Sequence, residues 1–155
     1  MTAVMTNDVT NRAQKKGVII NLSNHRVPQH AYDSLREKFS LKEITTFSYP
    51  CRFDFNSDLW KQVEDVMISL KENEKQQVNC FSAEGQKVIL LPSVKEGAVM
   101  IALYITSVLG YAPNIGLIGK DNKGLPVLKQ VLDLEAFRMK AANYWRKEIL
   151  FEEEK

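Results

Sequence analysis

The stretch GVIINLSNHRVP, from Gly17 to Pro28, decides how this chain folds. Its apolar run, Val18 to Leu22, has the length and composition of a buried strand. The run stops at Ser23-Asn24-His25, and a helical pattern begins at Pro28, which suits the first turn of a helix. The stretch therefore predicts a strand that delivers small polar side chains to its own carboxyl end. In open α/β sheets, ligands bind at that end of the strands.

Strand and helix patterns alternate along the rest of the chain. Apolar residues recur at helical spacing from Ala31 to Phe39 and from Leu59 to Leu70, and both patterns indicate amphipathic helices. This alternation is typical of β-α-β units with a mainly parallel sheet. We therefore predict a single Rossmann-like α/β domain, residues 17–150, with helices flanking the sheet, after a flexible lead of residues 1–16. Further strands are predicted for residues 42–49, 78–83, 87–91, 114–120 and 127–132.

Two further helices are predicted in the second half of the chain. Residues Gly97–Leu109 are apolar almost all round, so this helix should be buried on most sides, either by the domain or by a second subunit. The last helix begins after Asp133, a good capping residue. We expect that helix to carry four residues inward, namely Phe137, Ala141, Tyr144 and Trp145.

Composition excludes several classes of protein. The 155 residues include 21 basic and 19 acidic ones, and this near-balance argues against long nucleic acid as a partner. The most hydrophobic run, Ala98–Leu109, is too short to span a bilayer, so no membrane association is expected. Cys51 and Cys80 have no disulfide framework and no zinc-ligand spacing, which predicts free thiols in a reducing cytoplasm.

Motifs for common cofactors are absent from the sequence. No G-x-G-x-x-G follows the first strand, and no G-x-x-x-x-G-K-[ST] occurs. His25 and His30 are five residues apart, which is not the spacing of a helical metal pair. We therefore predict no cofactor and no metal. Any bound phosphate would rest on side chains and a helix N-terminus rather than on a glycine loop.

The first candidate site is the polar segment Ser23, Asn24, His25 and Arg26. Ser and Asn side chains offer short hydrogen-bonding groups. His25 could stack on a base, bind a phosphate as a cation or move a proton, and Arg26 adds a permanent positive charge. The alternative is a polar turn in which Ser23 and Asn24 only satisfy backbone groups.

Two other strand ends supply candidate ligand contacts. Pro92, Ser93 and Gly97 join a strand to a helix, where N–H groups could face an anion and glycine permits close approach. The alternative there is a plain loop with Ser93 as a helix cap. Lys120 also follows a strand and could complete a phosphate site, although an exposed lysine is more often only solvated.

The chain resembles the small stand-alone accessory proteins of type III CRISPR loci. Three segments carry the resemblance within Gly17–Trp145: I-I-N-L-S-N-H from Ile19, G-Y-A-P-N-I-G-L-I from Gly110, and D-L-E-A-F-R from Asp133. These proteins are Rossmann-like and related in shape to the CRISPR-associated Rossmann fold domains. The resemblance implies a homodimer or higher assembly that binds a cyclic oligoadenylate, most often the four-adenylate ring, across its two-fold axis.

Three functions follow from these observations. The first is a binding protein that sequesters a cyclic oligoadenylate or assembles on it, because no catalytic constellation is visible and no catalytic residue is predicted. The second is a metal-independent ring nuclease, in which His25 or Lys120 would assist cleavage by the 2′-hydroxyl. The third is a non-catalytic subunit whose apolar helix, Gly97–Leu109, docks on a protein partner.

Overall fold

The computed structural model describes residues 16–71 and 85–153, and a five-stranded sheet lies at its centre. The strand order is β2-β1-β3-β4-β5, with the first four strands parallel and β5 antiparallel to β4. The lead expected at residues 1–16, apart from Lys16, and the strand predicted at 78–83 lie outside the described residues. The strands are β1 (Lys16–Asn21), β2 (Glu43–Ser48), β3 (Gln86–Leu90), β4 (Asn114–Lys120) and β5 (Pro126–Asp133).

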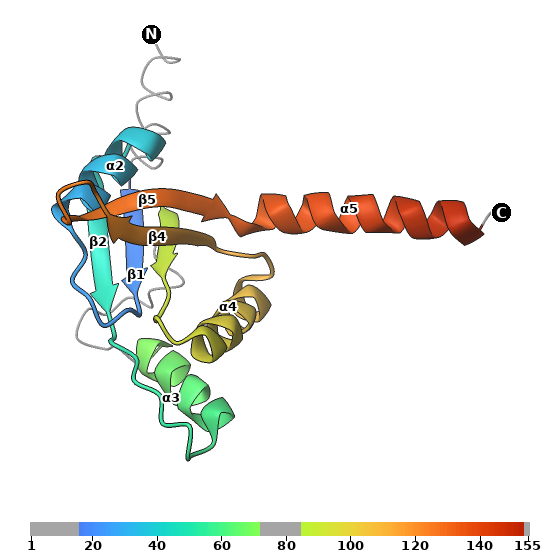
Figure 1. The fold of residues 1–155 in the computed structure, drawn as a ribbon, viewed down its shortest axis with the longest axis horizontal. Helices are drawn as coiled ribbons and strands as arrows, with labels where there is room; N and C mark the ends of the chain where they lie inside the picture. The colour runs from blue at the N-terminus through green and yellow to red at the C-terminus, as the bar shows by residue number, and fades with distance from the viewer. Residues whose placement is uncertain (1–15, 72–84, 154–155) are drawn as a thin grey trace, which may run out of the picture.

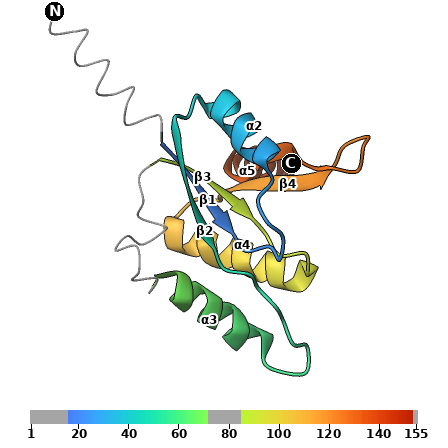
Figure 2. The same cartoon turned by 90° about the vertical axis from the view of Figure 1, so that its left-hand side faces the viewer.

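Helices cover both faces of the sheet. The described helices are α2 (Gln29–Phe39), α3 (Leu59–Lys71), α4 (Lys95–Leu109) and α5 (Leu134–Glu153). Figure 2 shows α2 on one face of the sheet and α3 and α4 together on the other. This arrangement confirms the predicted single Rossmann-like α/β domain with a mainly parallel sheet flanked by helices.

The core divides in two because side chains alternate along each strand. On β1, Ile19 packs toward α2 with Leu35. Val18 and Ile20 pack toward α3 and α4, where Ile101 and Ile105 meet them. All six side chains are almost fully buried. β1 is therefore covered on both faces, as its unbroken apolar run predicts.

Helix α4 is less buried than its composition predicts. Only Gly97, Ile101 and Ile105 are buried, whereas Val99 and Leu103 are 67% and 68% exposed. The expectation that this protomer buries the helix on most sides is therefore wrong. The reason is that α4 lies in the outer layer, so one stripe faces the sheet and the remaining apolar residues face outward.

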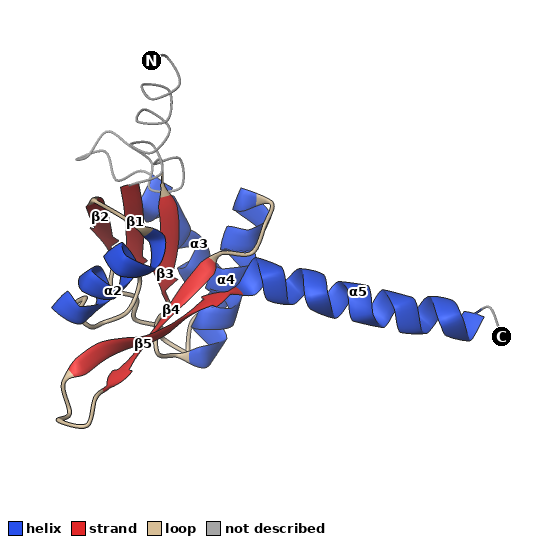
Figure 3. Cartoon of the chain, turned by 90° about the horizontal axis from the view of Figure 1, so that it is seen from above, coloured by secondary structure: helices blue, strands red, loops and turns tan. Residues whose placement is uncertain are grey.

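Helix α5 leaves the domain instead of packing against it (Figures 1 and 3). Phe137, Tyr144 and Trp145 are 71%, 60% and 63% exposed, so the prediction that they point inward is wrong, and Ala141 is only partly buried. The predicted cap is present, since the Asp133 carboxylate accepts a hydrogen bond from the Ala136 N–H at 3.0 Å. The helix follows β5 with no intervening loop, and Figure 1 shows it running on from β5 away from the sheet.

The first turn of α5 is anchored by Glu135. Its carboxylate accepts hydrogen bonds from the Arg138 Nε–H at 3.0 Å and from the Ala112 N–H at 2.7 Å. The hydrogen bonds from Arg138 and then Ala112 lower the pKa of Glu135 to about 2. A carboxylate with a lowered pKa stabilises the fold above its ordinary pKa and loses that contribution as pH falls toward the lowered value.

The anchor predicts a specific pH dependence. We expect wild type to be more stable to urea than Glu135→Gln at neutral pH, and this difference to shrink as pH falls from the ordinary value of 4.5 toward 2. Between pH 7 and pH 5 the difference should stay constant, because Glu135 is ionised in both the folded and the unfolded chain. Urea unfolding of both proteins across this range tests the prediction, and a difference that is independent of pH down to 2 contradicts it.

Two expectations from composition are answered in part. Cys51 is a buried free thiol, and burial raises its pKa to about 11, whereas Cys80 lies outside the described residues. Among the described residues, no helix combines the length and the apolar character needed to cross a bilayer.

Candidate functional site

The strand order creates a switch point at the carboxyl end of β1. The chain passes from β1 through α2 to β2 on one side, while β3 pairs with β1 on the other side. Asn21, the last residue of β1, lies opposite Leu90, the last residue of β3. The polar segments that follow these two strands therefore share one edge of the sheet. In open α/β sheets, this is the place where ligands bind.

Asn21 organises the loop after β1. It is 4% exposed and is the only buried polar residue among those described. Its Nδ2 donates to the His25 carbonyl oxygen at 2.8 Å, and its Oδ1 accepts from the Ser23 N–H at 3.0 Å and the Ser23 Oγ–H at 2.6 Å. These bonds close residues 21–25 into a fixed turn. Reasoning from sequence missed Asn21, although an asparagine ending an apolar strand was a visible signal.

The loop residues divide into two groups. The Ser23 hydroxyl is used inside the loop, since it also lies 3.2 Å from the His25 carbonyl oxygen and 3.3 Å from the His25 nitrogen. For Ser23 the polar-turn alternative therefore describes the structure. Asn24, His25 and Arg26 are exposed, and their side chains make no hydrogen bond to any other described residue. These three side chains are thus presented to solvent by a braced loop.

A polar cleft of about 840 Å³ lies on the β2 side of this loop. Pro126 of β5 completes its rim. Tyr32 and Thr46 are joined across the cleft lining by a hydrogen bond of 2.8 Å between their hydroxyl oxygens. The polar lining comes from the end of β1, the loop, α2 and β2, and comprises Asn21, Ser23, Asn24, His25, Arg26, Gln29, Tyr32, Thr46 and Ser48.

A second hollow of about 470 Å³ lies on the β3 side of the same loop. Pro92 and Ser93 line it, together with Lys95. Ser23, His25 and Arg26 line both hollows, so the loop is the wall between them. The apolar walls of the second hollow are Leu90, Leu91, Ala98, Ile115, Leu117 and Ile118.

Three of the candidates from sequence have different surroundings. Gly97 lies under Phe53, because a Cβ on Gly97 would meet the Phe53 ring at 2.3 Å, so its small size accommodates a side chain of the same chain. Ser93 does not cap α4, since the cap position is Val94 and no side chain bonds there. Lys120 is exposed and lines neither hollow, although its partner Pro126 lines the first.

The electrostatic character of this edge is positive. Helices α2 and α4 both begin here, after Pro28 and Val94, and neither has a side-chain cap. Uncapped N–H groups and the helix dipole favour an anion. Arg26 and Lys95 add two cations, of which Lys95 lies 4.0 Å from the Glu96 carboxylate of the same helix, and no carboxylate lines either hollow. The arrangement can bind an anionic ligand with apolar parts.

Metal chemistry has no counterpart in the described part of the chain. No group of three or more His, Cys, Asp or Glu side chains there is arranged to hold a metal ion. His30 has a structural partner, since its Nδ1 accepts a hydrogen bond from the Leu128 N–H of β5 at 3.0 Å. That bond satisfies a backbone N–H beside the irregularity in the β4–β5 pairing.

No family model, curated protein or solved structure matches this chain.

Proposed function

We propose that this protein is a cytoplasmic type III CRISPR accessory protein that binds a cyclic oligoadenylate, cyclic tetra-adenylate first, at the loop of residues 23–26. One observation carries the proposal. Asn24, His25 and Arg26 are exposed on a braced loop between two hollows at the switch point of the sheet. The resemblance of the chain to such accessory proteins selects the ligand from the anionic nucleotides that this edge could accept.

The first hollow is lined mainly by polar side chains and the second mainly by apolar ones, and a nucleotide likewise has polar and apolar parts. Phosphates suit Arg26 and the uncapped N-terminus of α2, because both favour negative charge. Ribose hydroxyls and the polar edges of a base suit Asn24 and the hydroxyl of Ser48 in the polar cleft. An adenine ring suits the apolar walls of the second hollow. A small anion of this kind needs no large excess of positive charge, and the formal net charge is only +2.

Assembly supports the same ligand. A two-fold axis presents the same loop twice, and a cyclic tetranucleotide is itself roughly symmetric. A homodimer would therefore face the ring with two copies of Asn24, His25 and Arg26. Lys120 lies beyond the two hollows in one protomer, so it would reach the ring only from the protruding β4–β5 hairpin.

The lining of the hollows favours binding over cleavage. No Asp or Glu lines either hollow, so His25 has no acid–base partner there. A slow, metal-independent ring nuclease is the second candidate function, because His25 is exposed and lines both hollows beside Arg26, the residue that we propose to hold a phosphate. Radiolabelled cyclic tetra-adenylate incubated with excess protein separates the two. Recovery of intact ring supports the binder, and conversion to linear product supports the nuclease.

Substitutions in the loop test the site itself. We expect Arg26→Ala to weaken binding of cyclic tetra-adenylate by about 10- to 100-fold, the loss of one charge-assisted hydrogen bond, and Asn24→Ala by about 5- to 10-fold. Neither variant should lower the melting temperature, because both side chains are exposed. Titration calorimetry gives the affinities, and thermal melting checks the fold.

Arg52→Ala is the matched control, since Arg52 is exposed and lines neither hollow. It should bind as wild type does. A ligand that binds only the folded state must raise the melting temperature. If no mono-, di- or cyclic nucleotide raises it, the nucleotide proposal is wrong. The protein-interaction function, favoured by the exposed Val99 and Leu103 of α4, then takes its place.

A further inference from the structure

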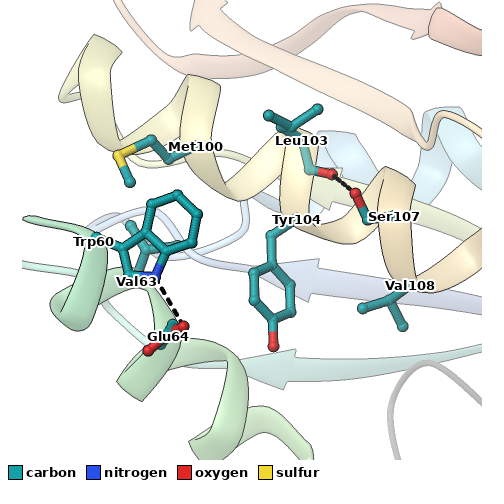
Figure 4. A pocket seen from close by; sticks show the side chains of 8 residues that line it. All are labelled: Trp60, Val63, Glu64, Met100, Leu103, Tyr104, Ser107 and Val108. Carbon is teal, nitrogen blue, oxygen red and sulfur yellow. Dashed lines mark hydrogen bonds between the residues drawn. The ribbon is translucent and has the colours of Figure 1, made fainter.

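A small groove lies between α3 and α4, away from the proposed ligand site (Figure 4). Its volume is about 270 Å³, and no described residue lines both this groove and a hollow at the sheet edge. That volume lies below the roughly 300–1,000 Å³ of sites for drug-sized ligands, so the groove suits a smaller molecule. We name it the α3–α4 groove; the described residues that line it are Trp60, Val63, Glu64, Met100, Leu103, Tyr104, Ser107 and Val108.

The charge of the α3–α4 groove is opposite to that of the sheet edge. Glu64 is the only charged residue among the described ones that line the groove, whereas Arg26 and Lys95 line the hollows at the sheet edge. Glu64 is only partly exposed, and no cation pairs with it in the described part of the chain, although Lys61 lies one turn earlier on α3. A carboxylate that is partly withdrawn from water and unpaired attracts a cation.

The Glu64 carboxylate is held in place by Trp60. Its Oε1 accepts a hydrogen bond from the Trp60 Nε1–H at 2.8 Å, and the two residues are one turn apart on α3. This bond, the dashed line between them in Figure 4, fixes the indole and the carboxylate relative to each other. The second oxygen, Oε2, accepts no hydrogen bond from any described residue. One carboxylate oxygen is therefore positioned and still available to a ligand.

Two aromatic rings line the same groove. Trp60 belongs to α3 and Tyr104 to α4, and Figure 4 shows Tyr104 pointing toward the side of the groove that carries Glu64. Among the described residues, neither ring stacks on another ring or has a cation over its face. Aromatic faces attract cations, and Trp and Tyr rings are the usual contacts of quaternary ammonium groups. The rings and the carboxylate therefore favour the same class of ligand.

We propose that the α3–α4 groove binds a small organic cation, an ammonium ion that carries methyl or other short alkyl groups. The Glu64 carboxylate meets the charge, and the two rings and the apolar lining contact the alkyl groups. A hard metal ion such as Ca²⁺ needs several oxygen ligands, whereas the described lining offers one carboxylate. The size of the groove commits the proposal to a free small molecule. This inference does not rest on the proposed function.

The indole N–H signals in a proton–nitrogen correlation spectrum of the full chain test the site. Choline chloride is the probe, and sodium chloride at the same concentration controls for ionic strength. We expect choline to shift the Trp60 signal, with a dissociation constant on the order of 1 mM, and to leave the Trp145 signal in place. The neutral alcohol in which carbon replaces the choline nitrogen should bind at least about 5-fold more weakly. Trp60→Phe assigns the two signals.

Variants separate the contribution of the charge from that of the rings. Glu64→Gln keeps an acceptor for the indole and removes the charge, so choline binding should weaken about 5- to 10-fold. Asp65→Asn is the matched control and should bind as wild type does, because Asp65 is an exposed carboxylate on α3 that does not line the groove. Tyr104→Leu should weaken binding about 2- to 5-fold, and Tyr104→Phe, which keeps a ring, should weaken it less.

Three results would each overturn the proposal. The first is a Trp60 signal that choline shifts no further than sodium chloride does. The second is equal binding of the neutral alcohol, because the groove would then be only apolar. The third is unchanged choline binding by Glu64→Gln, with backbone signals that show a folded variant. Phosphatidylcholine vesicles that sediment the protein would assign the groove to a lipid headgroup, and that outcome would also exclude a free small molecule as its occupant.

Discussion

Replacing Asn21 by alanine is expected to destabilise the fold by about 3 kcal/mol and to abolish ligand binding. The substitution removes three hydrogen bonds, each with a net contribution of about 1 kcal/mol. It also leaves the Ser23 N–H without its partner, and leaves the His25 carbonyl with only the Ser23 hydroxyl at 3.2 Å, at the end of a buried strand. The loop that carries Asn24, His25 and Arg26 then loses its fixed shape, so binding fails even where the domain still folds.

Asn24→Ala is the matched comparison for this prediction. It removes the same side chain three residues further along, but from an exposed position with no hydrogen bond to another described residue. Urea unfolding should therefore separate the two variants by about 3 kcal/mol. Equal stability of the two variants would show that Asn21 does not brace the loop. Retained binding in Asn21→Ala would show that the loop shape is not needed.

Gly85→Ala is expected to destabilise the fold by about 3 to 5 kcal/mol. Gly85 has φ +117°, a backbone conformation that side-chain-bearing residues rarely adopt. An added Cβ would also lie 2.3 Å from the Lys16 carbonyl oxygen, which belongs to the backbone and cannot rotate away. Relief would separate the starts of β1 and β3 where Gly17 pairs with Gln86.

Gly110→Ala distinguishes the two causes of that loss. Gly110 has φ +80° in the cap of α4, but nothing lies within 4 Å of the position of an added Cβ. Its cost should be only the conformational one, about 1 to 2 kcal/mol. Urea unfolding of both variants gives the comparison. Equal losses would mean that the contact with Lys16 contributes nothing.

The sheet was predictable because its strands have strong local signals. The apolar runs of β1 and β3 and the helical spacing of α3 depend only on neighbouring residues. Strand order is not a local property, so the position of β3 beside β1 could not be read from the chain. The same holds for the switch point, although the polar tip of β1 marked its position.

The candidate site was predictable in position and only partly in the role of each residue. Short polar residues after a strand indicate a loop, but the sequence could not divide them into those that brace it and those that face solvent. Asn21 holds the loop from the end of the strand, and the Ser23 hydroxyl is hydrogen-bonded within the turn. The role of Gly97 depends on long-range packing, because Phe53 lies against it. The role of Ser93 depends on where α4 begins, and the cap position is Val94.

The exposure of apolar side chains on α4 and α5 was mispredicted for one shared reason. An apolar residue on a helix indicates that something covers it, but not whether the cover belongs to the same copy of the chain. Leu103 and Phe137 have the composition of core residues and the exposure of surface residues. Sequence periodicity cannot distinguish a domain core from an intermolecular interface.

The positions of the two tryptophans have a spectroscopic consequence. Trp60 and Trp145 are the only indoles of the chain, and both are more than 60% exposed in the protomer. An indole in water emits at longer wavelength than one in apolar surroundings, so unfolding a single protomer changes this emission little. The intrinsic tryptophan fluorescence of the protein therefore reports on what covers α3 and α5, and it carries no signal from the sheet or its polar edge.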